Sequence, residues 1–184
     1  MRKLLVVVVM CCVVTVCGAG AGEWRFPVRL SYPTGAQDVI DAYEDYGNAD
    51  ASTLSGAGIS FAPYMQFDHG SRVGGGLGPI FIIVGDLSHW DVPLSVTYGF
   101  TLLPDADVSP YAYLGPIYHV AGGDFYEDAS PGLVVGIGVE FKRETSVGFG
   151  FELAYDSSEM TLGYGWLGRD VKPGEVVVSG FVVF

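Results

Sequence analysis

The chain has 184 residues, of which 21 are acidic and nine basic, and its net charge is −12. This excess of acid argues against a nucleic-acid partner and against electrostatic docking onto anionic lipid. All three cysteines lie within the first 17 residues, so the chain beyond them has neither a disulfide nor a cysteine-based metal site.

The first 21 residues have the three parts of a secretory signal peptide. Met1-Arg2-Lys3 is basic, residues 4–16 are uncharged, and Ala19-Gly20-Ala21 is a small-x-small cleavage site. We expect a cleaved signal peptide at 1–21 and one mature domain at 22–184, with seven basic residues and a net charge of −14. Two alternatives stay open. The signal could remain as an anchor, although a bilayer span needs about 20 apolar residues, or the chain could be lipidated at Cys17.

Beyond the signal, large apolar residues alternate with small or polar ones, which is the period of a β-strand with two different faces. Residues 147–155 carry Val, Phe, Phe, Leu and Tyr at odd positions and Gly, Gly, Glu and Ala at even positions. Similar alternation predicts eight strands, at about 26–33, 55–67, 72–85, 90–103, 110–122, 131–143, 146–156 and 174–184. The facing of the strands at 72–85 and 110–122 stays open.

The two faces differ in a way that favours a membrane barrel over a soluble sandwich. Small residues suit a narrow lumen, and a face of long aliphatic and aromatic side chains needs lipid around it. A strand in lipid must have every backbone group paired, which a closed barrel achieves. The predicted fold class is therefore all-β, a closed eight-stranded antiparallel up-and-down transmembrane β-barrel.

The first long connection, residues 34–54, predicts a short helix at about 36–46. Thr34 and Gln37 have capping-box spacing, and Val39, Tyr43 and Tyr46 recur at helical intervals. The helix and a second connection carry the acidic outer-loop residues Asp38, Asp41, Glu44, Asp45, Asp124, Glu127 and Asp128. One interpretation is a solvated acidic rim. The other is divalent-cation binding that bridges the rim to lipopolysaccharide phosphates.

The connections alternate in length, as they do between periplasmic turns and outer loops, except that residues 86–89 are short where a longer loop is expected. Residues 68–71, 104–109 and 143–146 are short, 34–54 and 157–173 are long, and 123–130 are intermediate. An even strand number then places both termini on the periplasmic side. Aromatic residues near the strand ends predict two girdles, one with Trp24, Phe67, Tyr111 and Phe184 and one with Tyr32, Trp90, Tyr155 and Trp166.

Four charged residues fall on the small-residue face, namely Arg29, Glu140, Lys142 and Glu152. Charges in lipid are costly, so we expect them in the lumen, either as a structural ion-pair network or as the lining of a conducting path. Eight strands leave little room beyond side chains, which favours a filled lumen. His119 could serve a lipid-modifying enzyme, but the spacing typical of a catalytic triad is missing.

Several segments resemble outer-membrane β-barrel domain proteins, the small eight-stranded OmpA-like and OmpX-like barrels of the porin family of Gram-negative bacteria. These segments are residues 92–98 with Ser109-Pro110-Tyr111 to Gly115, and residues 132–155. The terminal Val182-Val183-Phe184 is similar to the aromatic signal recognised by the barrel-assembly machinery, with Val178 and Val182 on the face of Phe184. The resemblance implies the cell outer membrane, contact with its lipid and lipopolysaccharide, and passage through that machinery.

The predicted function is structural or one of surface interaction, by a monomer with acidic extracellular loops, no cofactor and no catalytic residues. Three alternatives remain, which are a narrow pore for small solutes, a lipid-modifying barrel enzyme, and an exported soluble β-sandwich.

Overall fold

The structure is a computed structural model that describes residues 22–47, 57–78, 80–84, 87–141, 147–164 and 167–184. The predicted signal peptide, Lys142 and Trp166 lie outside these residues. Among the described residues, no helix has the length and apolar character needed to cross a membrane.

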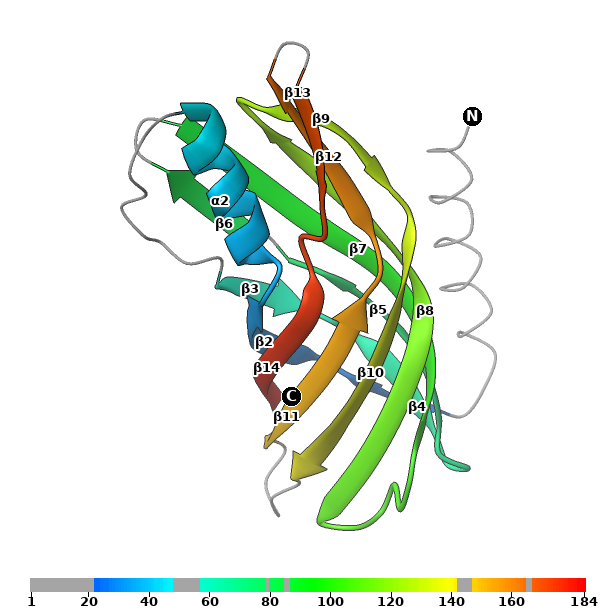
Figure 1. Cartoon of the computed structure of the whole chain (residues 1–184). Coiled ribbons are helices and arrows are strands. Elements are labelled where there is room, and N and C mark those ends of the chain that lie inside the picture. The colour runs from blue at the N-terminus through cyan, green and yellow to red at the C-terminus, as the bar shows by residue number, and fades with distance from the viewer. Residues whose placement is uncertain (1–21, 48–56, 79, 85–86, 142–146, 165–166) are drawn as a thin grey trace.

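Eight antiparallel strands close into a barrel (Figure 1), which confirms the predicted fold class. Around the ring they are β2 (Pro27–Pro33), β3 (Gly58–Phe61), β5 (Ser71–Leu77), β7 (Leu87–Thr101), β8 (Val108–Gly123), β10 (Gly132–Phe141), β11 (Gly148–Asp156) and β14 (Glu175–Val183), which pairs back with β2. Three short strands prolong them, because β1 (Gly22–Arg25) precedes β2, β4 (Tyr64–Phe67) follows β3, and β6 (Ile80–Val84) continues β5 beside β7. Closure pairs the ladder groups that an open edge would leave exposed.

The strands present the two faces that the alternation predicts. In the β10–β11 ladder, Ile137 lies opposite Leu153 and Gly138 lies opposite Glu152. Leu153 is 47% exposed on the outside of the barrel, whereas its neighbour Glu152 is 5% exposed and points inward. The same outward face carries the predicted assembly-signal residues Val178, Val182 and Phe184, which are all exposed.

The facing of β8, left open by the sequence, is resolved by the structure. Tyr111 and Tyr113 point into the lumen and are buried, and Leu114 is exposed on the outside. The prediction that Tyr111 belongs to an outer aromatic girdle is therefore wrong, because strand parity turns it inward. Trp24 and Phe184 at one end and Trp90 at the other are exposed as the girdles require. In β5, Arg72 is buried, and the side chains of β6 are not described.

The predicted helix is confirmed as α2 (Ala36–Gly47), which covers one end of the barrel (Figure 1). Its apolar face is buried together with the connections between strands, in a cluster of Ala36, Val39, Ile40, Ala42, Tyr43, Ala121, Phe125, Met160, Leu162 and Val171. The capping box is not formed. The Thr34 hydroxyl accepts a bond from the Val176 amide at 3.2 Å, and the Gln37 amide donates to Asp41 at 2.7 Å.

Two connections predicted to be loops instead form a small outer sheet. β9 (Tyr126–Ser130), β12 (Glu159–Tyr164) and β13 (Leu167–Val171) pair antiparallel, with β12 in the middle. The physical reason is the apolar face of α2, since Met160 and Leu162 of β12 are buried in the cluster beneath it. This end of the barrel thus has a covered core of its own.

The opposite end carries the turns at 68–70 and 102–107 and the chain end. Gly22 pairs with Phe67 beside the turn at 68–70, and the Phe26 amide donates to the Phe184 carbonyl at 3.1 Å. Gly70 in that turn has φ +95°, a conformation that glycine adopts without strain. Residue 22 and the C-terminus therefore lie at the short-turn end, as an even strand number requires.

Candidate functional site in the barrel lumen

The lumen holds two layers of buried polar side chains, and the layer nearer the short turns is centred on Glu152. Arg29 of β2 forms an ion pair with Glu152 at 2.9 Å, and the hydroxyls of Tyr111 and Tyr113 each donate to it at 2.8 Å. These bonds join β2, β8 and β11 across the barrel. Because every donor reaches a charged acceptor in a buried site, each bond is stronger than a neutral one.

The same layer contains a second carboxylate and a second guanidinium. The Tyr64 hydroxyl donates to Glu140 at 2.6 Å. The Arg72 guanidinium lies between two aromatic rings, 3.7 Å from the ring centroid of Tyr64 and 4.1 Å from that of Tyr111. Such cation–π contacts stabilise a desolvated charge. We call Arg29, Tyr64, Arg72, Tyr111, Tyr113, Glu140 and Glu152 the inner layer.

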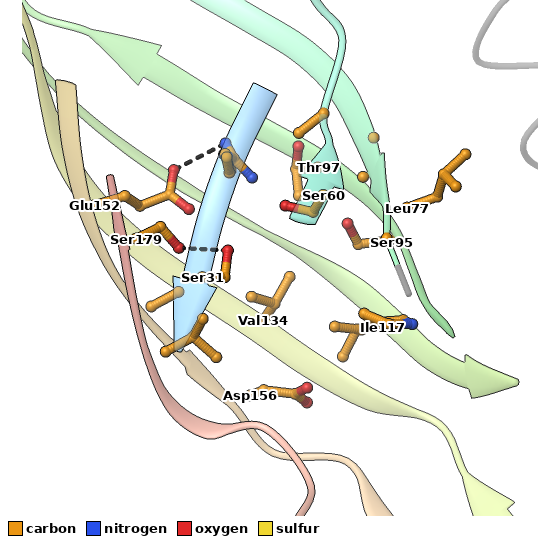
Figure 2. Close-up of a pocket in the computed structure, with 18 of the residues that line it drawn as sticks. Ser31, Ser60, Leu77, Ser95, Thr97, Ile117, Val134, Glu152, Asp156 and Ser179 are labelled. Carbon is orange, nitrogen blue, oxygen red and sulfur yellow. Dashed lines mark hydrogen bonds and ion pairs between the residues drawn. The ribbon is translucent and has the colours of Figure 1, made fainter. Parts of the chain in front are cut away.

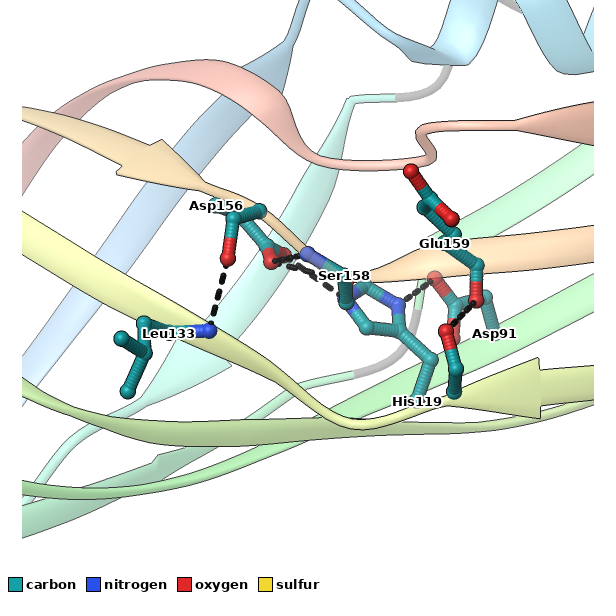
Figure 3. A network of polar contacts seen from close by, with 8 residues as sticks. Asp91, His119, Leu133, Asp156, Ser158 and Glu159 are labelled. Atoms are coloured by element: carbon teal, nitrogen blue, oxygen red, sulfur yellow. Dashed lines mark hydrogen bonds and ion pairs between the residues drawn. The ribbon is translucent and has the colours of Figure 1, made fainter.

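The layer beneath α2 is centred on His119 (Figure 3). Its Nδ1 lies 2.5 Å from Asp91 and its Nε2 lies 2.7 Å from Asp156, so β7, β8 and β11 meet at one imidazole. Ionised carboxylates only accept hydrogen bonds, so both contacts together require a doubly protonated, positively charged ring. Asp156 also accepts bonds from the amide and the hydroxyl of Ser158, at 2.9 Å and 2.7 Å. We call Asp91, His119, Asp156 and Ser158 the outer layer.

A histidine contact ties the helix cap to the barrel. The Tyr43 hydroxyl of α2 lies 3.2 Å from Nδ1 of His89, and both side chains are fully buried. Burial raises the pKa of Tyr43 to about 12, so its hydroxyl stays protonated, and it lies within 3.4 Å of the Ser88 carbonyl, to which it can donate. The other His89 nitrogen and one Asp91 oxygen are buried without a protein partner. Buried water commonly satisfies such groups.

Between the two layers lies a cavity of about 110 Å³. Figure 2 shows Ser60, Ser95 and Thr97 on one side of it and Ser31, Ser179 and Glu152 on the other. The Ser31 and Ser179 hydroxyls bond to one another at 2.9 Å. The expectation of a side-chain-filled lumen thus describes the two layers, and a chamber lined by both apolar and polar residues remains between them.

The sequence singled out part of this arrangement. Arg29, Glu140 and Glu152 lie in the lumen, and Lys142 is outside the described residues. The sequence analysis did not assign Tyr64, Arg72, Asp91 or Asp156 to the site, and weighed His119 only for catalysis. Strand parity could have placed Asp91 and Asp156 inside, since each alternates with exposed residues of β7 or β11. Their shared contact with His119 joins three strands and has no local signal.

The acidic outer-loop residues are spread over the end that α2 covers. Asp38, Asp45, Asp124, Glu127 and Asp128 are exposed, while Asp41 and Glu44 are partly buried on α2. Some already have protein partners. Asp45 pairs with Arg169 at 3.5 Å, and Asp124 accepts the Ser88 amide at 2.8 Å. Within the described part of the chain, no group of three or more His, Cys, Asp or Glu side chains is placed to hold a metal ion.

The histidine environment differs from that of a hydrolase triad. In a triad the serine hydroxyl contacts the imidazole. Here the Ser158 hydroxyl donates to Asp156, and both His119 nitrogens face carboxylates. Among the described residues, no serine hydroxyl contacts His119.

Comparison with known proteins gives a fold and no close relative. No family model and no curated protein matches the sequence. Among solved structures, the chain is similar to OprG, an outer membrane protein of Pseudomonas aeruginosa, with a TM-score of 0.60 and 12% identity over 89% of this chain and 96% of OprG. It is also similar to the Neisserial surface protein A, with a TM-score of 0.54 and 12% identity over 89% of this chain and 98% of that protein. The predicted resemblance to small outer-membrane barrels is confirmed at the level of the fold.

Proposed function

We propose that the chain is exported with a signal peptide cleaved after Ala21 and that residues 22–184 insert into the outer membrane as a monomer. The observation that supports this proposal most strongly is the apolar outer surface of the barrel. Large apolar side chains cover it at high exposure, among them Leu30 at 64%, Ile59 at 63% and Phe151 at 61%. Soluble monomers rarely expose apolar patches above a few hundred Å². A bilayer accepts such a surface, because the closed ladder leaves its backbone groups paired.

Heat-modifiable migration tests this proposal. In a detergent gel, we expect the unboiled protein to migrate differently from the boiled protein, and membranes washed with urea to retain it. Mass measurement of the purified protein should give a chain that begins at Gly22. Identical migration together with release by urea would favour the exported soluble β-sandwich instead.

We further propose a structural or surface-interaction role without enzymatic activity. Two layers of polar side chains cross the lumen and α2 covers one end, so we take the acidic helix and the outer sheet of β9, β12 and β13 to be the features that contact partners. These would face lipopolysaccharide and neighbouring cell surfaces, with divalent cations as bridges to phosphate. The cation bridge predicts that calcium raises the unfolding temperature or slows cleavage of α2 by protease. An unchanged temperature and an unchanged cleavage rate would contradict it.

A narrow pore is the second candidate, and the chamber between the layers favours it. Conduction would require both layers to open, since Glu152 and His119 each hold three strands together. In planar bilayers we expect no unitary current steps from the wild-type protein. Reproducible steps that change in His119→Ala would favour the pore over the closed barrel.

A further inference from the structure

Arg72 is a buried cation without a bonded counter-ion among the described residues. It is 6% exposed, and its guanidinium contacts two tyrosine rings but makes no hydrogen bond or ion pair with the described residues. Its Nη1 atom is buried without a partner. A guanidinium is always charged and carries five N–H donors. A buried charge in this state is unfavourable unless an anion or water compensates it.

The neighbouring carboxylates are engaged elsewhere. Glu152 accepts bonds from Arg29, Tyr111 and Tyr113, and Asp156 accepts bonds from the outer layer. Glu140 is held by Tyr64 and keeps one buried oxygen without a partner. Glu140 makes no ion pair with Arg72 and does not line the cavity. Arg72 lines the chamber, and among the described residues no carboxylate is bound to its guanidinium.

The chamber beside Arg72 is small, and its wall combines apolar residues such as Ile117 and Val134 with polar and charged ones. Arg29 and Arg72 line it together with the hydroxyl residues Ser60, Ser95 and Thr97. Glu152 and Asp156 also line it, but Glu152 is paired with Arg29 and Asp156 with His119. Arg29 also has a buried Nε without a partner. Gly76 also lines the chamber, and a Cβ there would lie 3.1 Å from the Ser95 hydroxyl oxygen and 3.7 Å from the Ala62 Cβ.

We propose that this chamber is a binding site for a small oxyanion, of the size of inorganic phosphate or a short carboxylate. Arg72 supplies the charge and a free N–H donor, Arg29 supplies its Nε–H, and the hydroxyls of Ser60, Ser95 and Thr97 supply further donors. Guanidinium groups suit oxyanions because their planar donors match the oxygen geometry. A volume of about 110 Å³ admits a free small anion and excludes a lipid with its acyl chains.

The test is calorimetric titration of the refolded barrel in a detergent with an uncharged headgroup. Sodium phosphate and sodium acetate are titrated separately at constant ionic strength, with bulky gluconate as the background anion and no chloride. We expect saturable binding of at least one of the two anions to a single site. Arg72→Met keeps the length of the side chain and removes its charge, so affinity should fall by about tenfold or more.

Two further variants separate the site from a general salt effect. Gly76→Val fills the chamber and leaves Arg72 in place, so it should also lose binding. Arg169→Met removes a cation on β13, where the side chain is 42% exposed, and should bind as the wild type does. Each variant must show heat-modifiable migration, and Gly76→Val decides the question if Arg72→Met does not fold.

Three results would overturn the proposal. These are no binding of either anion to the wild type, wild-type affinity in both Arg72→Met and Gly76→Val, or binding that appears only in Glu140→Gln. The last result would show that Glu140 already compensates Arg72, through water. Heat-modifiable migration is measured separately and does not depend on anion binding. Failure of the anion site is therefore distinguishable from failure of the membrane-barrel proposal.

Discussion

Replacing Glu152 with glutamine tests whether the inner layer holds the barrel closed. The change keeps the shape of the side chain and removes its charge. Three donors from two other strands converge on this carboxylate, at 2.8–2.9 Å. In Glu152→Gln, the guanidinium of Arg29 loses its bonded anion, and the amide oxygen cannot serve all three donors as well as a carboxylate does.

The magnitude follows from burial, since the Glu152 side chain is 3% exposed and that of Arg29 is 15% exposed. Removing one partner of a buried ion pair costs about 3–5 kcal/mol. Hydroxyls that lose their acceptor add to this cost without strict additivity. We therefore expect a loss of about 4 kcal/mol in the free energy of unfolding. For a domain of this size, that corresponds to a fall of about 8–16 °C in the unfolding temperature.

Urea unfolding in lipid vesicles, followed by tryptophan fluorescence and by gel migration, measures this loss. Glu159→Gln is the matched control, because Glu159 is exposed on β12 and its side chain should contribute within about 0.5 kcal/mol. A double-mutant cycle with Arg29→Gln isolates the energy of the pair. If Glu152→Gln costs no more than Glu159→Gln, the inner layer does not hold the strands together and the reasoning is wrong.

Three further changes test the cap, the packing of the lumen and the assembly signal. Tyr43→Phe removes the hydroxyl contact to His89 and should loosen α2 by about 1 kcal/mol, seen as faster protease cleavage of α2 with unchanged urea unfolding of the barrel. Gly150→Val places a Cβ against the Phe181 ring and the Val139 carbonyl of β10, and it should prevent heat-modifiable folding, whereas Gly168→Val, in open space, should fold normally. Phe184→Ala should refold in detergent but accumulate poorly in outer membranes, and wild-type accumulation would contradict the assembly role.

The alternation of large and small residues was enough to predict the closed barrel, because a period of two fixes which side chains share a face. The alternation could not decide which side chains of β8 point into the lumen, because tyrosines and apolar residues occur at both odd and even positions of that strand. Tyr111 shows the difficulty. Its aromatic ring suits an interfacial girdle, yet its hydroxyl finds a buried acceptor in Glu152, and that contact depends on a strand 41 residues away.

The sequence of the outer sheet contains an alternation typical of a strand, but it lies within a long connection that we predicted to be a loop. Met160, Leu162 and Tyr164 alternate with Glu159, Thr161 and Gly163, which is the pattern of a strand. A segment flanked by serines and proline between two long strands resembles an ordinary loop, and the partner that buries its apolar face is a helix more than 100 residues earlier. Tertiary packing against α2 therefore decides the structure of this segment.

The arrangement of the lumen follows from the surroundings that we propose for the barrel. A soluble domain is held closed by apolar side chains that leave water for its core. In a bilayer, outward residues such as Phe151 and Leu153 meet lipid whichever way neighbouring strands are tilted, so they do not specify closure. Specificity then falls to the ladder and to charged groups such as Glu152 and His119, each bonded to two other strands. Buried charged groups that would destabilise the core of a soluble domain thus determine the shape of this barrel.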